Sequence, residues 1–419
     1  MLIFARLQDK MRPESFIASR LFSLNAKQVS SSIVQIARMS VAIGLAVMMI
    51  SVAVVIGFKN QIRDKVTGFV ADIRITALNN NLSVEASPLS FSTELEEVLL
   101  SHPDEIDHYQ LVAEKAGILK TENEILGVVL KGVGTDYSWK YLSSKIIGGR
   151  LPAFNDSAAS DEIIISKKIA SRLKVNTNDP LRMWFVDGDN ARTRGRRFIV
   201  SGIYETGLVE FDERYILGDV QHVQRLYNWN SEQFGAVELT TNVKTSSAGL
   251  AGKLYYAVPA NLDVKTAEEE NPQLFDWLEL QDMNVWIILI LMVLVSGITM
   301  VSTLLIIILE RTNMIGILKA MGANNAFIRR IFLINSYRIL FSGMLWGNIF
   351  AIILILLQSN FGFLKLPEES YYLSEVPVEL SLIHFVILNL GVFILWSVTM
   401  LIPVSVVNAI QPYKAIRYA

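Results

Sequence analysis

The feature that most constrains this chain is a set of four uncharged apolar runs, each long enough to cross a lipid bilayer. The runs occupy residues 39–58, 285–309, 331–358 and 380–402, and only Arg338 interrupts the third. A helix needs roughly 20 apolar residues to span about 30 Å of hydrocarbon. Hydrophobic residues make up 52% of the 419 positions, which is too apolar for an ordinary soluble protein. The sequence therefore predicts a membrane protein with four transmembrane helices.

The charges beside these runs predict the orientation, because Lys and Arg in short loops remain on the cytoplasmic side. The N-terminal segment is basic, and Arg311, Lys319, Arg329 and Arg330 lie between the second and third runs. The loop between the third and fourth runs is acidic instead. The basic start lacks the compact apolar core of a cleavable signal, so we expect the first run to stay as an anchor. Both termini are then cytoplasmic, and the long segment after the first run lies outside.

The long outer segment reads as a mixed α+β domain. Apolar, β-branched runs such as DIRITAL (72–78) and ILGVVLKGV (125–133) alternate with helical runs such as STELEEVLLS (92–101). Ser or Asp stands at the expected N-caps of the helical runs. Residues 271–284 have helical apolar spacing, which predicts a helix that continues directly into the second span.

The predicted location is the inner (cytoplasmic) membrane, as a multi-pass protein whose large domain lies in the periplasm. The expected organisation is a cytoplasmic amphipathic segment (1–32), a first span (33–58), a periplasmic α+β domain (59–283), a second span (284–309), a cytoplasmic coupling helix (310–330), a third span (331–358), a periplasmic loop (359–379), a fourth span (380–404) and a cytoplasmic tail (405–419).

Several kinds of chemistry are missing from the sequence. The formal net charge is -2, without the clustered basic surface that nucleic-acid binding needs. With no cysteine there is no disulfide, thiolate metal site or cysteine nucleophile. The four histidines show no metal-binding spacing, and no G-x-x-x-x-G-K-[ST] loop occurs to hold ATP. We therefore expect a chain that is not an enzyme, holds no cofactor and takes its energy from another subunit.

The turn between the second and third spans predicts a short amphipathic helix. Met314, Ile317, Leu318 and Met321 recur at i, i+3, i+4 and i+7 and form one apolar face. We expect Thr312 or Asn313 to cap its start, and Gly322 to end it in the left-handed conformation. An apolar ridge of this size suits a groove on another protein. The alternative is a helix that lies on the membrane surface. The candidate residues of this helix are Glu310, Arg311, Met314, Ile315, Gly316, Ile317, Leu318, Lys319, Met321 and Gly322.

A polar hairpin in the outer domain is a second candidate site. The segment DGDNARTRG (187–195) joins two predicted strands, and arginines lie in and after it. Loops on rigid scaffolds often carry partner contacts, although a solvated loop is the alternative. The candidate partner-contact residues are Arg192, Arg194, Arg196 and Arg197.

The first span carries a third candidate site. Met48, Met49, Val52 and Val55 form an apolar patch, and methionine side chains adapt to irregular acyl chains. The span also contains Gly44 and Gly57, which permit a neighbouring helix to approach closely. The patch is therefore a candidate contact for the lipid of a cargo, and ordinary helix packing is the alternative.

The cytoplasmic turn also resembles a known family. Glu310 and Arg311 followed by IGILKAMGA (315–323) are similar to the cytoplasmic signature of FtsX-like, or MacB-type, ABC transporter permeases. Further segments resemble the lipoprotein-releasing LolC/LolE permeases, and together they span nearly the entire chain. These segments are FIASRLF (16–22), the Gly-Phe pair at 57–58, VVLKGV (128–133), IIISKKIASRLKVNTND (163–179), FIVSGIYETGLVEFDERYIL (198–217) and FGFLKLPEESYYLSEVPVEL (361–380).

This resemblance implies a function and a set of partners. It implies a permease pair, identical or different, with two copies of a separate LolD-like ABC ATPase that hold ATP and magnesium. It implies docking of that ATPase on the cytoplasmic helix, extraction of lipoproteins from membrane lipid, and transfer to a periplasmic LolA-like carrier. The family's carrier-binding hairpin is longer and contains prolines, which 187–195 lacks.

Two other functions stay open from the sequence. One is a MacB-like efflux or mechanotransmission permease, although such chains usually carry their own ATPase. The other is an FtsX-like signalling permease that activates a periplasmic hydrolase, although its outer domain is typically much smaller.

Overall fold

The computed structural model describes residues 29–79, 87–121, 124–186, 193–242, 245–367 and 371–409. The basic start of the chain, Arg192 and the basic tail lie outside these residues. The chain divides into two compact units. The helical unit comprises Met1–Lys59, Leu278–Lys365 and Glu375–Ala419, and the second unit comprises Asn60–Trp277 and Leu366–Ser374.

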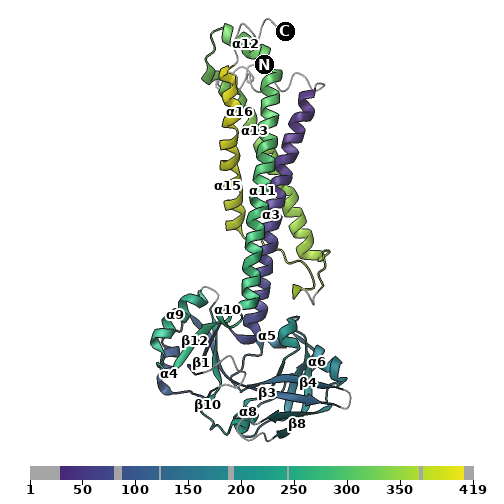
Figure 1. The fold of residues 1–419 in the computed structure, drawn as a ribbon, viewed down its shortest axis with the longest axis vertical. Coiled ribbons are helices and arrows are strands. Elements are labelled where there is room, and N and C mark those ends of the chain that lie inside the picture. The colour runs from purple at the N-terminus through teal and green to yellow at the C-terminus, as the bar shows by residue number, and fades with distance from the viewer. Residues whose placement is uncertain are drawn as a thin grey trace, which may run out of the picture. The chain divides into compact units, whose positions relative to one another are not determined.

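Four helices of the described chain are long and apolar enough to cross a membrane (Figure 1). They are α3 (Val29–Val70), α11 (Pro272–Glu310), α13 (Asn325–Phe361) and α15 (Leu382–Thr399), the last followed by α16 (Leu401–Ser405) and the 3-10 helix η1 (Val406–Ala409). The 42 residues of α3 correspond to about 63 Å, far longer than the apolar run inside it. Likewise α11 begins at Pro272, so the predicted helix through residues 271–284 into the second run is confirmed.

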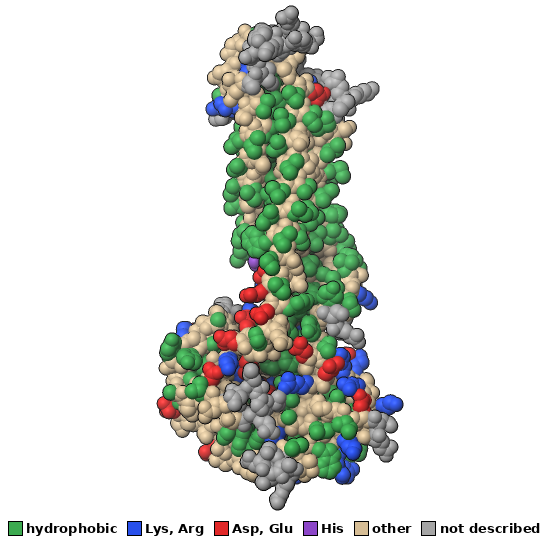
Figure 2. Space-filling view, viewed as in Figure 1, with side chains coloured by type: hydrophobic (Ala, Val, Ile, Leu, Met, Phe, Trp, Pro, Cys, Tyr) green, Lys and Arg blue, Asp and Glu red, His purple; other side chains and the backbone are tan. Residues whose placement is uncertain are grey.

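The helical unit has its own apolar core. Leu45 and Met49 of α3, Leu304 of α11, Leu340 of α13 and Trp396 of α15 are all buried in one cluster. The outward faces are also apolar, because Ile290, Leu294 and other large side chains of these helices remain exposed. Figure 2 shows hydrophobic side chains along this unit, with charged side chains near its ends. An apolar exterior around an apolar core is what a bundle in lipid requires.

The second unit contains a mixed sheet of ten strands (Figure 1). The order is β12-β1-β11-β3-β4-β9-β6-β8-β5, and β7 pairs with both β3 and β8. The pairs β4–β9 and β6–β8 are parallel and the others antiparallel. The strands are β1 (Ile73–Ala77), β3 (Ile106–Lys120), β4 (Ile125–Val133), β5 (Ile146–Gly149), β6 (Glu162–Ser166), β7 (Pro180–Val186), β8 (Thr193–Tyr204), β9 (Tyr215–Asp219), β11 (Ala236–Thr241) and β12 (Leu262–Thr266). A separate small sheet pairs β2 (Leu89–Ser90) with β10 (Gln233–Phe234).

Two apolar clusters divide the second unit into lobes. The first lobe packs β1, β11 and β12 against α4 (Thr93–Leu100) and α9 (Ser247–Ala257). The second lobe packs β4, β6, β7, β8 and β9 against α6 (Lys167–Leu173) and α8 (Val220–Tyr227). Because β3 pairs with β11 along its first half and with β4 along its second, it runs through both lobes. Three short helices complete the unit: α5 (Lys140–Ser143), α7 (Val209–Asp212) and α10 (Ala267–Glu270).

The mixed α+β prediction is confirmed, including its helix caps. Ser92 accepts a hydrogen bond from Leu95 N, Ser166 from Ile169 N, and Asp219 from Gln221 N. These contacts satisfy backbone donors that a helix start leaves unpaired.

Candidate functional site

The short helix between α11 and α13 has a well-defined C-terminal end. It is α12 (Thr312–Ala320), and Gly322 takes a φ of 93° just after it. Ala323 N donates to Leu318 O (2.9 Å) and Gly322 N to Lys319 O (3.0 Å), the two bonds of a Schellman C-cap. Asn324 then caps α13, accepting from Phe327 N at 2.8 Å. The turn from α12 to α13 is therefore fixed by its own backbone.

The expected cap at the start of α12 is wrong. The N-cap position is Arg311, whose side chain makes no capping hydrogen bond. The Thr312 hydroxyl instead donates back to Leu309 O of α11, at 2.6 Å. Thr312 is the first residue of α12 and Leu309 lies in the last turn of α11, so this bond connects the two helices.

The structure separates the four residues of the predicted apolar ridge. Ile317 is 49% exposed and Met321 80% exposed. Met314 and Leu318 instead pack against the core of the helical unit, beside the fully buried Ile315. The outward apolar surface of the turn is thus narrower than the sequence spacing predicts, since its neighbours cover half of the ridge.

The other candidate residues of the turn also differ in their burial and contacts. Lys319 Nζ donates to Val407 O of η1 at 2.8 Å, and desolvation by burial lowers the pKa of this amine. Arg311 is half-buried, and Glu310 lies exposed at the end of α11. Gly316 is buried against the core. Lys319 therefore fastens α12 to the last helical turn of the described chain.

The first-span candidates lie largely inside the helical unit. Met48 is 1% exposed and Met49 0%, both within the core cluster, while Val52 and Val55 are half-buried. This burial favours the helix-packing interpretation for the two methionines. Gly57 permits close approach, because a Cβ there would lie 3.0 Å from Pro377 O.

A glycine pair on α13 makes a tighter helix contact that sequence reasoning missed. A Cβ on Gly347 would lie 2.7 Å from Ala42 O of α3, and a Cβ on Gly343 would lie 2.5 Å from the Val41 side chain. The spacing Gly-x-x-x-Gly is a known signal for close packing of membrane helices. The signal was present in the sequence as GMLWG, at residues 343–347.

The same helix makes an amide pair with α15. Asn348 Nδ2 donates to Asn389 Oδ1 at 2.8 Å, and Asn389 Nδ2 donates to Asn348 Oδ1 at 3.2 Å. Asn389 also donates to Phe385 O, one turn earlier (2.9 Å). Each amide satisfies the other within an apolar segment, so the pair fixes α13 against α15.

The arginines of the outer hairpin belong to β8, except for Arg192, which lies outside the described residues. Arg194 and Arg196 are half-buried, and Arg197 is exposed. Arg194 Nη1 lies 3.4 Å from Leu226 O and thus contacts the end of α8. Arg197 stands opposite Arg182 of β7 in the ladder. Two arginines in register give this edge of the sheet a local positive charge.

A buried ion pair contacts the last turn of α3. Lys131 of β4 and Glu238 of β11 are both 0% exposed, and Lys131 Nζ lies 2.8 Å from Glu238 Oε1. The same ammonium donates to Phe69 O (2.8 Å), a carbonyl in the last turn of α3. Gln110 of β3 donates to Glu238 Oε2 at 2.8 Å. A cation at a helix C-terminus satisfies an unpaired carbonyl and complements the helix dipole.

A second charged cluster lies beside it. Arg74 of β1 pairs with Glu114 of β3 at 3.0 Å and approaches Glu270 of α10 at 3.5 Å. Burial raises the pKa of Glu270, and the nearby Arg74 opposes that shift. Sequence reasoning missed both clusters, because their members come from strands far apart in the chain.

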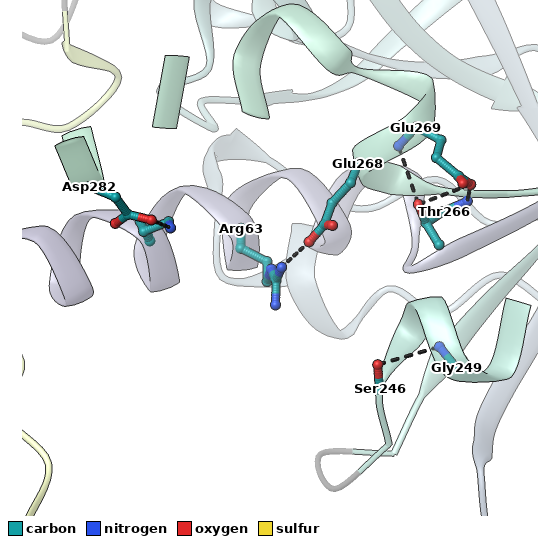
Figure 3. A network of polar contacts seen from close by, with 8 residues as sticks. Arg63, Ser246, Gly249, Thr266, Glu268, Glu269 and Asp282 are labelled. Carbon is teal, nitrogen blue, oxygen red and sulfur yellow. Dashed lines mark hydrogen bonds and ion pairs between the residues drawn. The ribbon is translucent and has the colours of Figure 1, made fainter. Parts of the chain in front are cut away.

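Charged side chains of α3 and α11 also form ion pairs (Figure 3). Within the helical unit, Lys59 Nζ lies 2.5 Å from Asp282 Oδ2 of α11. Within the second unit, Arg63 pairs with Glu268 of α10, at whose start Thr266 and Glu269 form a capping box. The loop before α15 joins the second unit, because Lys65 Nζ donates to Tyr372 O at 2.8 Å.

The described residues contain no group of three or more His, Asp or Glu side chains placed to hold a metal ion. Nor do the contacts above assemble a nucleophile with a general base.

Two family profiles match the chain. The profile described as "FtsX-like permease C-terminal" matches residues 286–412, and that described as "MacB-like periplasmic core domain" matches residues 36–272. Together they cover the candidate spans and the α+β unit.

Curated relatives match over nearly their full length. The "Lipoprotein-releasing system transmembrane protein LolC" of Xylella fastidiosa is 22% identical over 399 residues, 91% of this chain and 92% of the relative. LolC of Neisseria meningitidis serogroup B is 22% identical, over 93% of this chain and 94% of the relative. LolE of Haemophilus influenzae is 21% identical, over 93% and 96%. The solved periplasmic region of MacB from Actinobacillus actinomycetemcomitans is 15% identical, covers 50% of this chain and 95% of that chain, and superposes with a TM-score of 0.34.

Proposed function

Because this chain belongs to the family of membrane proteins with a MacB-like periplasmic core domain, we propose that it is the permease subunit of an ATP-driven lipoprotein-releasing transporter. It extracts lipoproteins from the inner membrane and passes them to a periplasmic carrier. The observation that carries this proposal is the extent of similarity to the lipoprotein-releasing relatives, 91–93% of this chain and 92–96% of theirs. A likeness confined to one module would leave the efflux and signalling alternatives equally open.

In this proposal the four apolar helices span the inner membrane, and both termini are cytoplasmic. The unit formed by Asn60–Trp277 then lies in the periplasm, between the first and second spans in the chain. The basic turn that contains α12 faces the cytoplasm, as the distribution of Lys and Arg requires.

The separate ATPase docks on α12. Ile317 and Met321 present an exposed apolar surface, while Lys319 and the C-cap hold the helix in place. A short helix that is rigid before binding loses little entropy when it enters a groove. ATP and magnesium belong to that partner, since this sequence has no phosphate-binding loop of its own.

Nucleotide-driven movement passes along the two long helices. Both α3 and α11 contribute residues to each compact unit, and α3 ends at the buried Lys131. A continuous helix transmits displacement without a flexible linker.

A second permease, identical or different, completes the pair. The cargo's lipid anchor passes beside Val52 and Val55 instead of the buried methionines. The arginines of β8 contact the carrier.

The test is a reconstituted release assay with the full chain. The chain is co-expressed with its ATPase and any second permease, purified, and its bound lipidated proteins are identified by mass spectrometry. Proteoliposomes loaded with a lipoprotein then receive ATP and a soluble carrier. We expect release that requires ATP and stops with a non-hydrolysable analogue. Nucleotide-dependent binding of a periplasmic hydrolase, with no lipoprotein retained or released, would replace this function with the signalling alternative.

A further inference from the structure

A cleft of about 630 Å³ lies between the two lobes of the second unit. Phe91 and Tyr109 line it from the first lobe, and Val220, Trp229 and Phe234 line it from the second. Cavities of 300–1,000 Å³ are typical of ligand sites. None of the described candidate residues for docking, carrier or lipid contact lines it.

Aromatic rings from both lobes line this cleft. Phe91 and Tyr109 stack on each other with centroids 5.9 Å apart. Trp229 stacks on Tyr227, with centroids 4.5 Å apart. These contacts hold the rings in position, yet all four remain partly exposed. Rings held in this way bind apolar side chains, and their faces attract cations, with little loss of entropy.

Carboxylates dominate the charge of the cleft. Asp136, Asp156 and Asp219 line it, against the guanidinium of Arg225 as the one basic group among its described lining residues. Asp219 is held by two backbone N–H groups, those of Gln221 (2.9 Å) and Ser160 (2.8 Å).

The other two carboxylates are less buried than Asp219. Asp156 is exposed and accepts one bond from the Thr135 hydroxyl at 3.0 Å. Burial raises the pKa of Asp136, and the hydrogen bond from Leu111 N, at 2.6 Å, opposes that rise. A bound cation would also lower this pKa. The cleft therefore combines a negative field with fixed aromatic surfaces.

We propose that this cleft binds an extended polypeptide segment that carries lysine or arginine beside an apolar side chain. The cation lies near Asp136 and Asp156, and the apolar side chain packs on Trp229 and Phe91. Exposed amides and hydroxyls, those of Asn155, Asn230 and Ser231, offer hydrogen bonds to a peptide backbone. Charge complementarity and backbone recognition together favour a basic peptide over an acidic peptide or a fatty acid.

The absence of native cysteine permits a direct test by disulfide tethering. Ser231→Cys places one thiol on the exposed lip of the cleft in the full-length chain, in detergent. The probes are acetyl-Phe-Lys-Leu-Lys-Cys-amide and its counterpart with Glu in place of both Lys, equilibrated in a thiol buffer and counted by intact mass. We expect the basic probe to be captured at least about tenfold more than the acidic one.

Charge variants then assign the preference to the cleft. Asp156→Asn is expected to lower the basic-to-acidic ratio about two- to fivefold, and Arg225→Gln to raise it by a similar factor, as for exposed charge pairs. Replacing the probe's Phe by Ala should lower capture about two- to tenfold. Ala248→Cys, exposed on α9 and not among the residues that line the cleft, should show a ratio near one.

Equal capture of both probes at Ser231→Cys overturns the proposal, as does the same preference at Ala248→Cys. Asn230→Cys serves as a second attachment point if Ser231→Cys lowers the yield of folded chain. Neither result bears on lipoprotein release, which is measured without these probes.

Discussion

The buried ion pair at the end of α3 allows a quantitative prediction. Lys131→Met removes the ammonium but keeps a side chain of similar length. Glu238 then remains fully buried, with a hydrogen bond from Gln110 and the more distant charge of Arg74, and Phe69 O loses the bond from Lys131. Removing one member of a buried pair costs about 3–5 kcal/mol, because the other charge is left uncompensated. We expect the second unit to lose stability by that amount.

Thermal unfolding converts this cost into a measurable shift. For units of 150–250 residues, 1 kcal/mol lowers Tm by about 2–4 °C, so Lys131→Met should lower it by roughly 6–20 °C. The full chain is unfolded in detergent and followed by near-ultraviolet circular dichroism, which reports the tertiary packing of aromatic side chains. Lys120→Met, at an exposed lysine of β3, is the matched control, expected within about 0.5 kcal/mol of the parent.

A double variant separates charge from shape. Lys131→Met with Glu238→Leu removes both charges, so it should recover at least half of the stability lost by the single change. A shift below about 2 °C for Lys131→Met would refute the reasoning. So would a double variant that is less stable than the single one, because the cost would then come from packing.

Three further predictions concern the helical unit and the orientation of the chain in the membrane. Ile317→Asp should abolish co-purification of the ATPase while Ile317→Leu preserves it, because a charge would enter the docking groove unpaired; equal recovery of ATPase with both variants would return α12 to the membrane-surface interpretation. Asn348→Leu should cost about 0.6–2 kcal/mol in detergent unfolding, and adding Asn389→Leu should cost less than a second equal loss, since each amide satisfies the other; strictly additive losses would contradict a coupled pair. In intact spheroplasts an impermeant thiol reagent should label Ser157→Cys but not Asn324→Cys, and the reverse pattern would overturn the orientation.

Local patterns in the sequence predicted much of the fold. Uncharged runs identify the candidate membrane helices, because an apolar helix of that length can cross the bilayer while it pairs its own backbone polar groups. Caps such as Ser92 and Ser166 are visible because the capping side chain and the backbone N–H that it accepts from are three residues apart. The strand 125–133 has the predicted bounds in the structure. These features depend on neighbours in the chain, which a sequence displays directly.

The missed features depend on partners distant in the chain. In the sequence Lys131 is a single polar residue in a predicted strand. The residues around it do not predict that it pairs with Glu238, which is distant in the chain. Spacing identifies the apolar side chains of α12 but not which of them the core covers, so the sequence alone does not distinguish Leu318 from Ile317. Met48 was ambiguous for the same reason, because an apolar side chain in a span suits either lipid or another helix.

Strand β1 is synthesised long before the two strands with which it pairs. Its residues 73–77 pair with β11 and β12, and Thr266 follows Ile73 by roughly 190 residues. At about 5–20 residues per second, synthesis of that stretch takes roughly 10–40 s. For most of this interval the strand lacks both neighbours, because β11 begins at Ala236, and an unpaired strand edge promotes aggregation. A growing chain of this kind therefore depends on the cell to shield its earliest strand until its last strand is made.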